Sequence, residues 1–148
     1  MSEGSRFYID TSALLPYYRE EPASGRVERF FRSQEPPLLI SDLTRVEFIS
    51  AISRWARMGE INESQANLLE NTFLKDLRAN LYISHPLTTR HFRQAEKWLS
   101  SRKTALRTLD ALHLACCLHL EAEIVTCDTH LHSAATIFGI PTRLISAP

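Results

Sequence analysis

Short hydrophobic runs alternate with longer amphipathic segments along the whole chain. Each run is only a few residues long and is bounded by polar or turn-forming residues, which is typical of buried strands. Between the runs, hydrophobic residues recur at helical spacing. Strands that alternate with helices favour a mostly parallel sheet covered on both faces. The pattern therefore predicts a three-layer α/β/α architecture with about five strands, at residues 7–9, 38–41, 81–84, 124–127 and 142–145.

Polar residues mark where the predicted helices begin. We expect Ser12 to cap a first helix, and Ser41 or Asp42 to cap the long helix after the second strand. Asn62 opens a sequence close to a capping box, and Thr108 precedes the most apolar helix of the chain. Several helices are thus expected to start directly after a strand, which places polar residues at one edge of the sheet.

Helical spacing also predicts which side chains face inward. In the long helix after the second strand, Val46 belongs to the expected apolar stripe, and Phe92 points inward from a later helix. The aromatic residues of the early helices, Phe30, Phe31 and Trp55, are expected mostly in the core. A surface that binds a partner is the alternative for these residues.

Composition indicates one globular domain spanning residues 1–148. Hydrophobic residues make up 44% of the chain and charged residues 23%, which argues against disorder. We find no internal repeat and no linker. The formal net charge is zero, so overall charge gives no argument for nucleic-acid binding.

Neither a membrane span nor an export signal is evident in the sequence. No uninterrupted apolar run approaches the ~18 residues that a membrane span requires, and residues 1–6 lack the apolar core of a signal peptide. The odd number of cysteines, with Cys116 and Cys117 adjacent, makes a poor disulfide framework. We therefore expect a cytoplasmic protein in which these adjacent cysteines serve core packing.

Two acids directly follow predicted strands. Asp10 ends the first run, and Asp128 follows the run at 124–127. In open α/β sheets, binding sites form outside the carboxyl ends of strands. Each acid alone is equally well explained as a helix cap or a turn residue. Together they predict a cation site, because a like-charged pair at ~4 Å costs about 4 kcal/mol at an effective dielectric of 20.

Asp110 and Glu47 are the other candidate acids. Asp110 lies in the first turn of a helix rich in Leu and Ala, where the helix dipole by itself favours a carboxylate. The apolar neighbours of Asp110 favour a cleft over open water. Glu47 lies between Val46 and Phe48, so its carboxylate either extends into solvent or points into a pocket, and the residue alone favours solvent.

The ordered set of these residues and their neighbours resembles the PIN-domain nucleases, and most closely the toxin subunit of VapBC toxin–antitoxin pairs. No single segment is specific, whereas the set in this order is. The matching segments are Tyr8-Ile9-Asp10-Thr11-Ser12-Ala13, Ser41 to Glu47 with Ser50-Ala51, Arg57-Met58-Gly59-Glu60-Ile61, Leu109-Asp110-Ala111-Leu112-His113-Leu114-Ala115 and Thr126-Cys127-Asp128.

The resemblance implies a metal-dependent endoribonuclease that cleaves RNA phosphodiester bonds with Mg²⁺ or Mn²⁺. Carboxylates without Cys or His partners suit such hard cations. Asp10 and Asp110 would hold the main ion, and Glu47 and Asp128 would complete the site directly or through water. Three further residues match positions that support the carboxylates by hydrogen bonds: Thr11, Ser12 and Thr126. The resemblance also implies a homodimer and a VapB-like antitoxin that covers the active site.

Basic and histidine side chains close to Asp110 are candidates for RNA binding. Arg102, Lys103 and Arg107 lie in the segment that leads to Asp110, where they either contact phosphates or form an ordinary exposed loop. His113 follows Asp110 by three residues on the same helical face. A packed or surface role is the simpler interpretation of His113, and ordering of the pocket or contact with RNA is the alternative.

Two other function classes are alternatives. A phosphohydrolase of the haloacid-dehalogenase type usually carries a second Asp two residues after the nucleophilic Asp, and this chain has Ser12 at that position. A non-catalytic α/β binding module is the other alternative, in which the acids only cap helices. Added Mg²⁺ or Mn²⁺ would stabilise a nuclease with a metal site and leave such a module unchanged.

Overall fold

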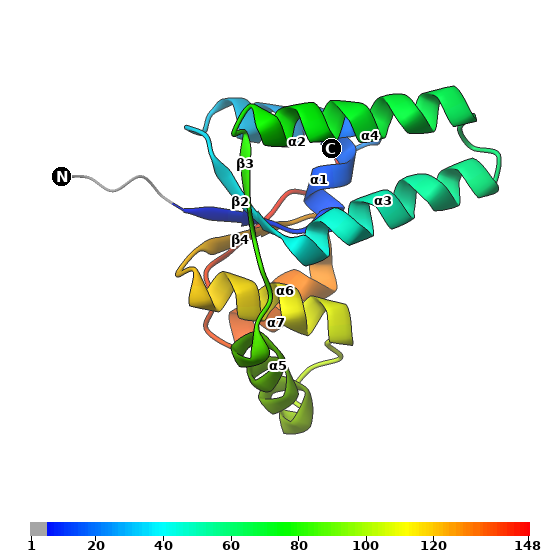
Figure 1. Cartoon of the computed structure of the whole chain (residues 1–148). Helices are drawn as coiled ribbons and strands as arrows, with labels where there is room; N and C mark the ends of the chain where they lie inside the picture. Colours follow the sequence, from blue (N-terminus) through cyan, green and yellow to red (C-terminus); the bar gives the residue numbers. More distant parts are fainter. Residues whose placement is uncertain (1–5) are drawn as a thin grey trace.

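The computed structural model describes residues 6–148, in which strands and helices alternate along the chain (Figure 1). The strands are β1 (Phe7–Ile9), β2 (Leu38–Ser41), β3 (Tyr82–His85), β4 (Glu123–Thr126) and β5 (Thr142–Leu144). The helices are α1 (Thr11–Tyr18), α2 (Ser24–Arg32), α3 (Asp42–Arg57), α4 (Glu63–Arg78), α5 (Thr89–Ser101), α6 (Thr108–His119) and α7 (Thr129–Ile137).

All five strands run parallel in one sheet, in the order β3-β2-β1-β4-β5. The central strand β1 pairs with β2, where Tyr8 lies opposite Leu39, and with β4, where Ile9 lies opposite Val125. The α/β prediction is confirmed, including the edge position of the last strand. Because the strands are parallel, their carboxyl ends lie along one edge of the sheet, where α/β proteins bind ligands.

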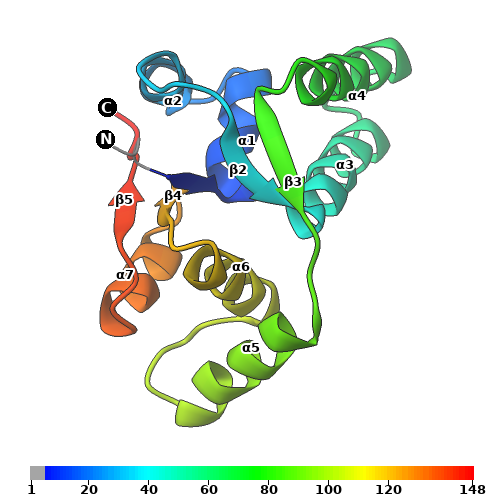
Figure 2. The ribbon, with the colours of Figure 1, turned by 60° about the vertical axis from the view of Figure 1, so that its left-hand side comes forward.

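The two faces of the sheet are covered by different helices. Figure 2 shows α1, α2, α3 and α4 on one side of the sheet and α5, α6 and α7 on the other. Successive strand residues point to opposite faces, so Phe7 and Ile9 join the core of the first four helices while Tyr8 joins that of α6 and α7. The helix α5 packs mainly against α6. The predicted three layers are therefore present.

Aromatic side chains fill the core beneath the first four helices. Phe30, Phe48 and Phe73 are buried there, and the rings of Phe48 and Phe73 lie 4.3 Å apart between centroids. Phe31 and Trp55 pack against this core while remaining partly exposed. The prediction that the early aromatic residues serve the core is confirmed, and so is the burial of the adjacent cysteines in α6.

Two predicted helix caps are wrong, the first by two residues and the second by one. Asp10, not Ser12, caps α1, because the Asp10 carboxylate accepts the backbone N–H of Ala13 at 3.2 Å. The helix α6 already begins at Thr108, and its cap is Arg107, which makes no side-chain hydrogen bond to the helix. The predicted cap at Ser41 is confirmed. At α1, the correction gives a strand-end carboxylate the additional role of helix cap.

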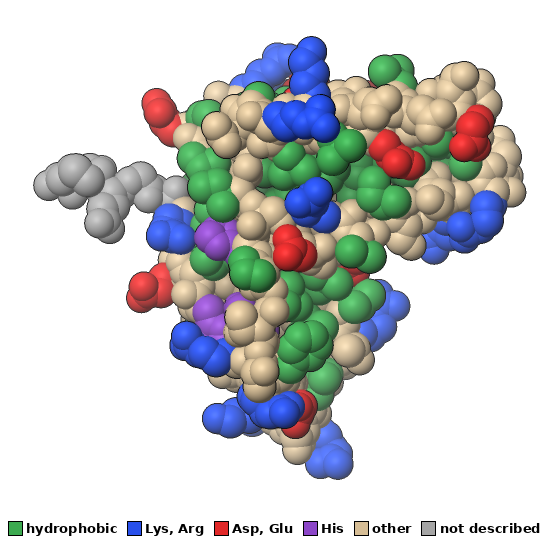
Figure 3. All heavy atoms as spheres, in the orientation of Figure 1, with side chains coloured by type: hydrophobic (Ala, Val, Ile, Leu, Met, Phe, Trp, Pro, Cys, Tyr) green, Lys and Arg blue, Asp and Glu red, His purple; other side chains and the backbone are tan. Residues whose placement is uncertain are grey.

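Two side chains expected in the core are exposed. Val46 is 67% exposed and Phe92 48%. The helix α3 packs against α1 and α4 through the side that carries Phe48 and Ile52, which leaves Val46 on the outside. In the space-filling view, hydrophobic side chains are also visible at the surface, and most Lys and Arg side chains lie toward the edges of this face (Figure 3). Across residues 6–148, no helix combines the length and the apolar character needed to cross a bilayer.

Candidate active site

Asp10 lies at the carboxyl end of the central strand, where β1 passes into α1. The backbone N–H of Asp10 donates to the Val125 carbonyl of β4 at 3.1 Å, so sheet pairing extends to this residue. Its side chain is buried, and burial raises the pKa of the carboxyl from 3.8 to about 6. The charge of His113 lowers this pKa but does not outweigh burial. Among residues 6–148 no Lys or Arg forms an ion pair with Asp10. Asp10 is thus a buried acid with only uncharged hydrogen-bond partners.

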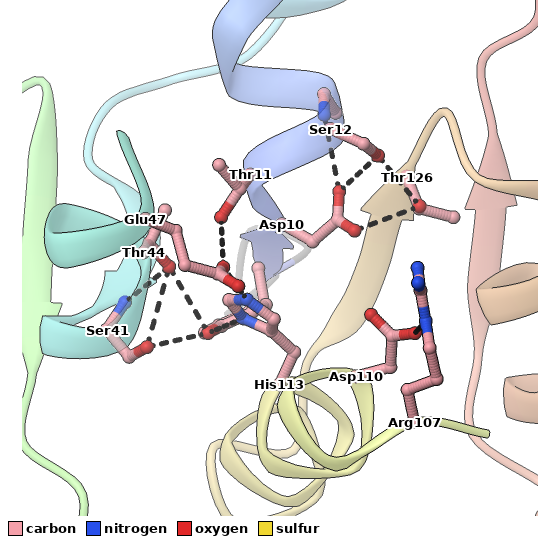
Figure 4. A network of polar contacts seen from close by, with 12 residues as sticks. Asp10, Thr11, Ser12, Ser41, Thr44, Glu47, Arg107, Asp110, His113 and Thr126 are labelled. Atoms are coloured by element: carbon pink, nitrogen blue, oxygen red, sulfur yellow. Dashed lines mark hydrogen bonds and ion pairs between the residues drawn. The ribbon is translucent and has the colours of Figure 1, made fainter. Parts of the chain in front are cut away.

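Two hydroxyl groups hold the Asp10 carboxylate from either side (Figure 4). Ser12 Oγ donates to Oδ1 at 2.8 Å, and Thr126 Oγ1 donates to Oδ2 at 3.1 Å. The same hydroxyls accept backbone N–H groups, Ser12 from Cys127 at 2.9 Å and Thr126 from Asp128 at 3.0 Å. These bonds join the start of α1 to the end of β4 and fix the orientation of the carboxylate.

Glu47 extends from α3 toward the end of β1. Thr11 Oγ1 donates to Glu47 Oε1 at 2.5 Å, and His113 Nε2 lies 2.5 Å from the same oxygen. Burial raises the pKa of Glu47, but the hydrogen bonds and the charge of His113 outweigh it, so the pKa lies below its ordinary value. Both contacts use Oε1, which leaves Oε2 without a hydrogen-bond partner among the described residues.

Tyr8 holds the other side of the His113 ring. The Tyr8 hydroxyl lies 2.7 Å from His113 Nδ1 and 2.8 Å from Ser41 Oγ. An ionised Glu47 can only accept, so His113 Nε2 donates to it. Burial raises the pKa of Tyr8 well above its ordinary value, so its hydroxyl keeps its proton. This buried chain joins β1, α6 and α3.

Asp110 lies in the first turn of α6, and its side chain is 20% exposed. Burial raises the pKa of Asp110, and the charge of Asp128 raises it further. The positive charge of Arg107 has the opposite effect and lowers the pKa of Asp110. Arg107 Nε lies 3.8 Å from Asp110 Oδ2. Because the Arg107 side chain is 83% exposed, solvent weakens this ion pair.

Three of the predicted acids surround one histidine. The charge of His113 lowers the pKa of Asp10, Glu47 and Asp110 alike, and the charge of Glu47 raises that of Asp110. Figure 4 shows these three acids extending from different elements toward the same region. Glu47, Asp110 and Arg107 line a cleft of about 550 Å³, which we call the acidic cleft.

Asp128, the fourth predicted acid, has a structural role of its own. Its Oδ1 accepts the backbone N–H groups of His130 at 2.8 Å and Leu131 at 3.3 Å, and so caps α7. Its charge raises the pKa of Asp110, so Asp128 lies close enough to act on that acid. One oxygen of this carboxylate is therefore occupied by the cap.

The predicted basic residues are not all at the cleft. Arg107 lines the acidic cleft, whereas Arg102 and Lys103 are exposed in the turn after α5 and line neither this cleft nor its neighbours. Arg102 ends α5 in a left-handed conformation with a φ of 55°. Of the three candidates, the structure brings only Arg107 to the acids.

The donor chemistry fits Mg²⁺ or Mn²⁺. Within residues 6–148, no three His, Cys, Asp or Glu side chains converge closely enough to hold one ion by themselves. Mg²⁺ typically keeps several waters and takes only one or two carboxylates directly, so it does not require three converging side chains. Asp10 and Asp110 are hard oxygen donors, and burial raises the pKa of both, so a cation would relieve an unfavourable state.

Sequence reasoning missed the buried chain behind Glu47. His113 shares a helical face with Asp110, and an ordinary packed or surface histidine is the simpler interpretation of the sequence. The structure buries His113 and also brings it into contact with Glu47 and Tyr8. The spacing signal was present, but its meaning depends on α3 and α6 meeting across the end of β1, which no local pattern specifies.

Comparison with known families supplies the remaining evidence. A family model described as "PIN domain" matches residues 7–137, which is most of the chain. The chain belongs to the PIN-domain family. The matched region contains all four acids and the hydroxyl residues around Asp10. A search of curated proteins found no match to this PIN-domain chain.

Solved structures from several bacteria share this PIN fold. FitAcB from Neisseria gonorrhoeae is 16% identical, with a TM-score of 0.73, and the match covers 92% of this chain and 95% of that one. Mycobacterium tuberculosis VapC20, described as a sarcin–ricin loop cleaving toxin, is 17% identical with a TM-score of 0.69, over 86% of this chain and 94% of its own. A toxin–antitoxin complex from Klebsiella pneumoniae is 16% identical with a TM-score of 0.62, over 84% and 88%. At these identities the likeness is one of fold.

Proposed function

We propose that this PIN-domain protein is a Mg²⁺- or Mn²⁺-dependent endoribonuclease that hydrolyses RNA phosphodiester bonds. The observation that carries the proposal is the buried Asp10 carboxylate, whose pKa is raised to about 6 and which lies near Glu47 and Asp110 at the carboxyl ends of parallel strands. A fold gains no stability from gathering such acids. Their arrangement is useful when a divalent cation binds between them and an anionic substrate.

Each acid has a distinct part in this proposal. Asp10 and Asp110 provide the carboxylate oxygens that hold the cation, and the hydroxyls of Ser12 and Thr126 keep Asp10 in its orientation. Oε2 of Glu47 has no hydrogen-bond partner among the described residues, so this oxygen is free to orient a water or accept its proton. When bound, the cation supplies Lewis acidity that activates water and neutralises charge developing on the phosphate. Asp128 acts from the edge of the site, because one of its oxygens caps α7.

The proposal extends to biological partners. One of the solved structures of this fold is named as a toxin–antitoxin complex, and another as a sarcin–ricin loop cleaving toxin. We propose by analogy that this protein is the toxin of such a pair, with a VapB-like antitoxin that covers the acidic cleft. We also propose a homodimer, for which exposed hydrophobic residues such as Val46 on α3 provide surface.

The test is cleavage of total RNA by purified protein with Mg²⁺, with Mn²⁺ and with EDTA. Wild type should produce discrete fragments only with a divalent cation, and Asp10→Asn should produce none under the same conditions. Mapping of the cleaved ends would then identify the preferred RNA. Full activity of Asp10→Asn, or equal cleavage in EDTA, would refute the proposal.

A further inference from the structure

A second depression adjoins the acidic cleft. It has a volume of about 470 Å³, and the two depressions share Glu47 and Leu109 as lining residues. Its wall along α3 includes Ser50, Arg54 and Arg57. We call this depression the arginine groove. The acidic cleft and the arginine groove are therefore neighbours, with Glu47 and Leu109 lining both.

The arginines of this groove follow from the periodicity of α3. Glu47, Arg54 and Arg57 are spaced by seven and three residues, which places them on one face of the helix. With a rise of about 1.5 Å per residue, Arg54 lies roughly 10 Å and Arg57 roughly 15 Å along the axis from Glu47. Long arginine side chains at these positions can reach phosphates that lie one or two nucleotides away from the acids.

The charges of these arginines are not used inside the protein. Both side chains are exposed, and neither forms an ion pair or a side-chain hydrogen bond with any residue from 6 to 148. Most of the arginines that form ion pairs within residues 6–148 do not line the cleft, as with Arg32 and Glu28 or Arg143 and Glu123. On the opposite side of the acids, Arg107 lines the acidic cleft. Positive charge thus flanks the acids on both sides.

Apolar side chains also line the two depressions. Leu109 is 47% exposed at the junction of the two depressions, and Leu15 and Ala51 also line the arginine groove. A polynucleotide strand combines anionic phosphates with apolar base and ribose surfaces. Neighbouring depressions lined by arginines and apolar side chains are complementary to such a strand. No aromatic side chain is among the residues that line either depression, which favours backbone contacts over base stacking.

We propose that Arg54 and Arg57 bind the phosphates of a single-stranded RNA segment on one side of the cleaved bond, while Arg107 binds on the other side. This inference rests on the proposed nuclease function and specifies the path of its substrate. It moves the main phosphate contacts from the exposed turn at Arg102 and Lys103 to helix α3. A protein partner with an acidic segment is the competing occupant of the groove.

The test compares two pairs of charge-neutralising substitutions. Arg54→Gln with Arg57→Gln removes the groove charges. Lys75→Gln with Arg78→Gln is a matched control, because these residues have the same spacing, also lie in the last turn of their helix and line neither depression. Arg54→Lys with Arg57→Lys preserves charge. All are also made in an Asp10→Asn background, so that binding is measured without cleavage.

The binding assay uses a labelled single-stranded RNA of mixed sequence, in EDTA, over a series of salt concentrations. The groove pair should weaken binding on the order of tenfold and reduce the slope of log K against log salt by about 1.4, since each phosphate contact contributes about 0.7 for single strands. The lysine pair should retain most of the affinity, and the α4 control should match the parent. In the cleaving protein, the groove pair should raise KM.

The outcomes separate the groove from the nuclease proposal. If the parent cleaves RNA and the groove pair behaves like the α4 control, the groove proposal is wrong while the nuclease stands. If the groove pair retains RNA binding but loses affinity for a poly-glutamate peptide, the groove binds protein and the proposal is again wrong. If the parent neither binds nor cleaves RNA, both proposals fail together.

Discussion

His113 Nε2 lies 2.5 Å from Glu47 Oε1, although 66 positions separate the two residues in the chain. The contact is nearly closed to solvent on the histidine side, where the ring is 2% exposed. Tyr8 holds the opposite ring nitrogen at 2.7 Å. Since Tyr8, Glu47 and His113 lie on the three elements that also position the acids, this chain of bonds sets the geometry of the whole site.

A pair of amide substitutions at His113 tests this positioning role. In His113→Gln the side-chain nitrogen can lie near the original Nε2 and still donate to Glu47, whereas in His113→Asn it lies near Nδ1 and cannot. We expect His113→Asn to lower kcat by roughly 10- to 100-fold, as removal of an outer-shell partner typically does, with little change in KM. His113→Gln should retain more of the activity.

The thermal stability of both His113 variants serves as the control for a simple loss of folding. His130→Asn, which changes an exposed histidine, should leave kcat unchanged. If the Gln and Asn variants lose activity equally at matched stability, Glu47 is not held by this contact in the working enzyme.

The pH dependence of stability should reveal the buried acids. In EDTA, folded Asp10 has a pKa of about 6 against 3.8 in the unfolded chain, so the folded state binds more protons between these values. Stability of the wild type is therefore lost as pH rises from about 4 to 6, by roughly 2–3 kcal/mol from this residue. Denaturant unfolding of wild type and Asp10→Asn at several pH values measures the difference, which should favour the variant increasingly up to pH 6.

Glu47 provides the contrast of opposite sign. Its folded pKa lies below the ordinary value, so its contribution is present above that ordinary value and is lost as pH falls. The stability lost in Glu47→Gln relative to wild type should therefore shrink toward acid pH. An increase of that difference at low pH would show that His113 and Thr11 do not favour the ionised carboxylate.

The fold could be predicted from sequence because its determinants are local. The buried run before Asp10 and the capping box at Asn62 each specify an element without reference to the rest of the chain. Parallel strands connected by helices then leave few possible arrangements. The predicted cap of α1 is wrong by two residues because both Asp10 and Ser12 are good caps, and only the position of the strand end decides between them.

The site could be predicted only in part. The acids were recognisable from their places after strands and from the resemblance, but their partners depend on how distant elements pack. Nothing local to Arg54 or Val46 indicates that the first lines a groove beside Glu47 and the second faces outward. Both outcomes depend on which side of α3 packs against α1 and α4.

Metal binding should stabilise the protein by mass action. At a free concentration of Mg²⁺ or Mn²⁺ near 100 times Kd, the folded state gains about 2.7 kcal/mol, which appears as a rise in Tm. Asp10→Asn and Asp110→Asn should each reduce or abolish that rise. Thermal melts with and without the cation, with Asp76→Asn on α4 as the control, measure it. An equal rise in all variants would place the cation elsewhere.

Asp128 offers a way to separate structural from electrostatic roles at one position. Asp128→Asn keeps a side-chain oxygen that can accept the N–H groups of His130 and Leu131, so the cap of α7 survives while the charge is lost. Asp128→Ala removes both, and should cost about 1 kcal/mol more in unfolding free energy.

Because the charge of Asp128 raises the pKa of Asp110, either variant should lower the pKa of Asp110, which carboxyl-carbon NMR in EDTA measures. If Asp128 serves the metal, both variants weaken Mn²⁺ binding equally; if it serves only the cap, Asp128→Asn binds Mn²⁺ and cleaves RNA like wild type.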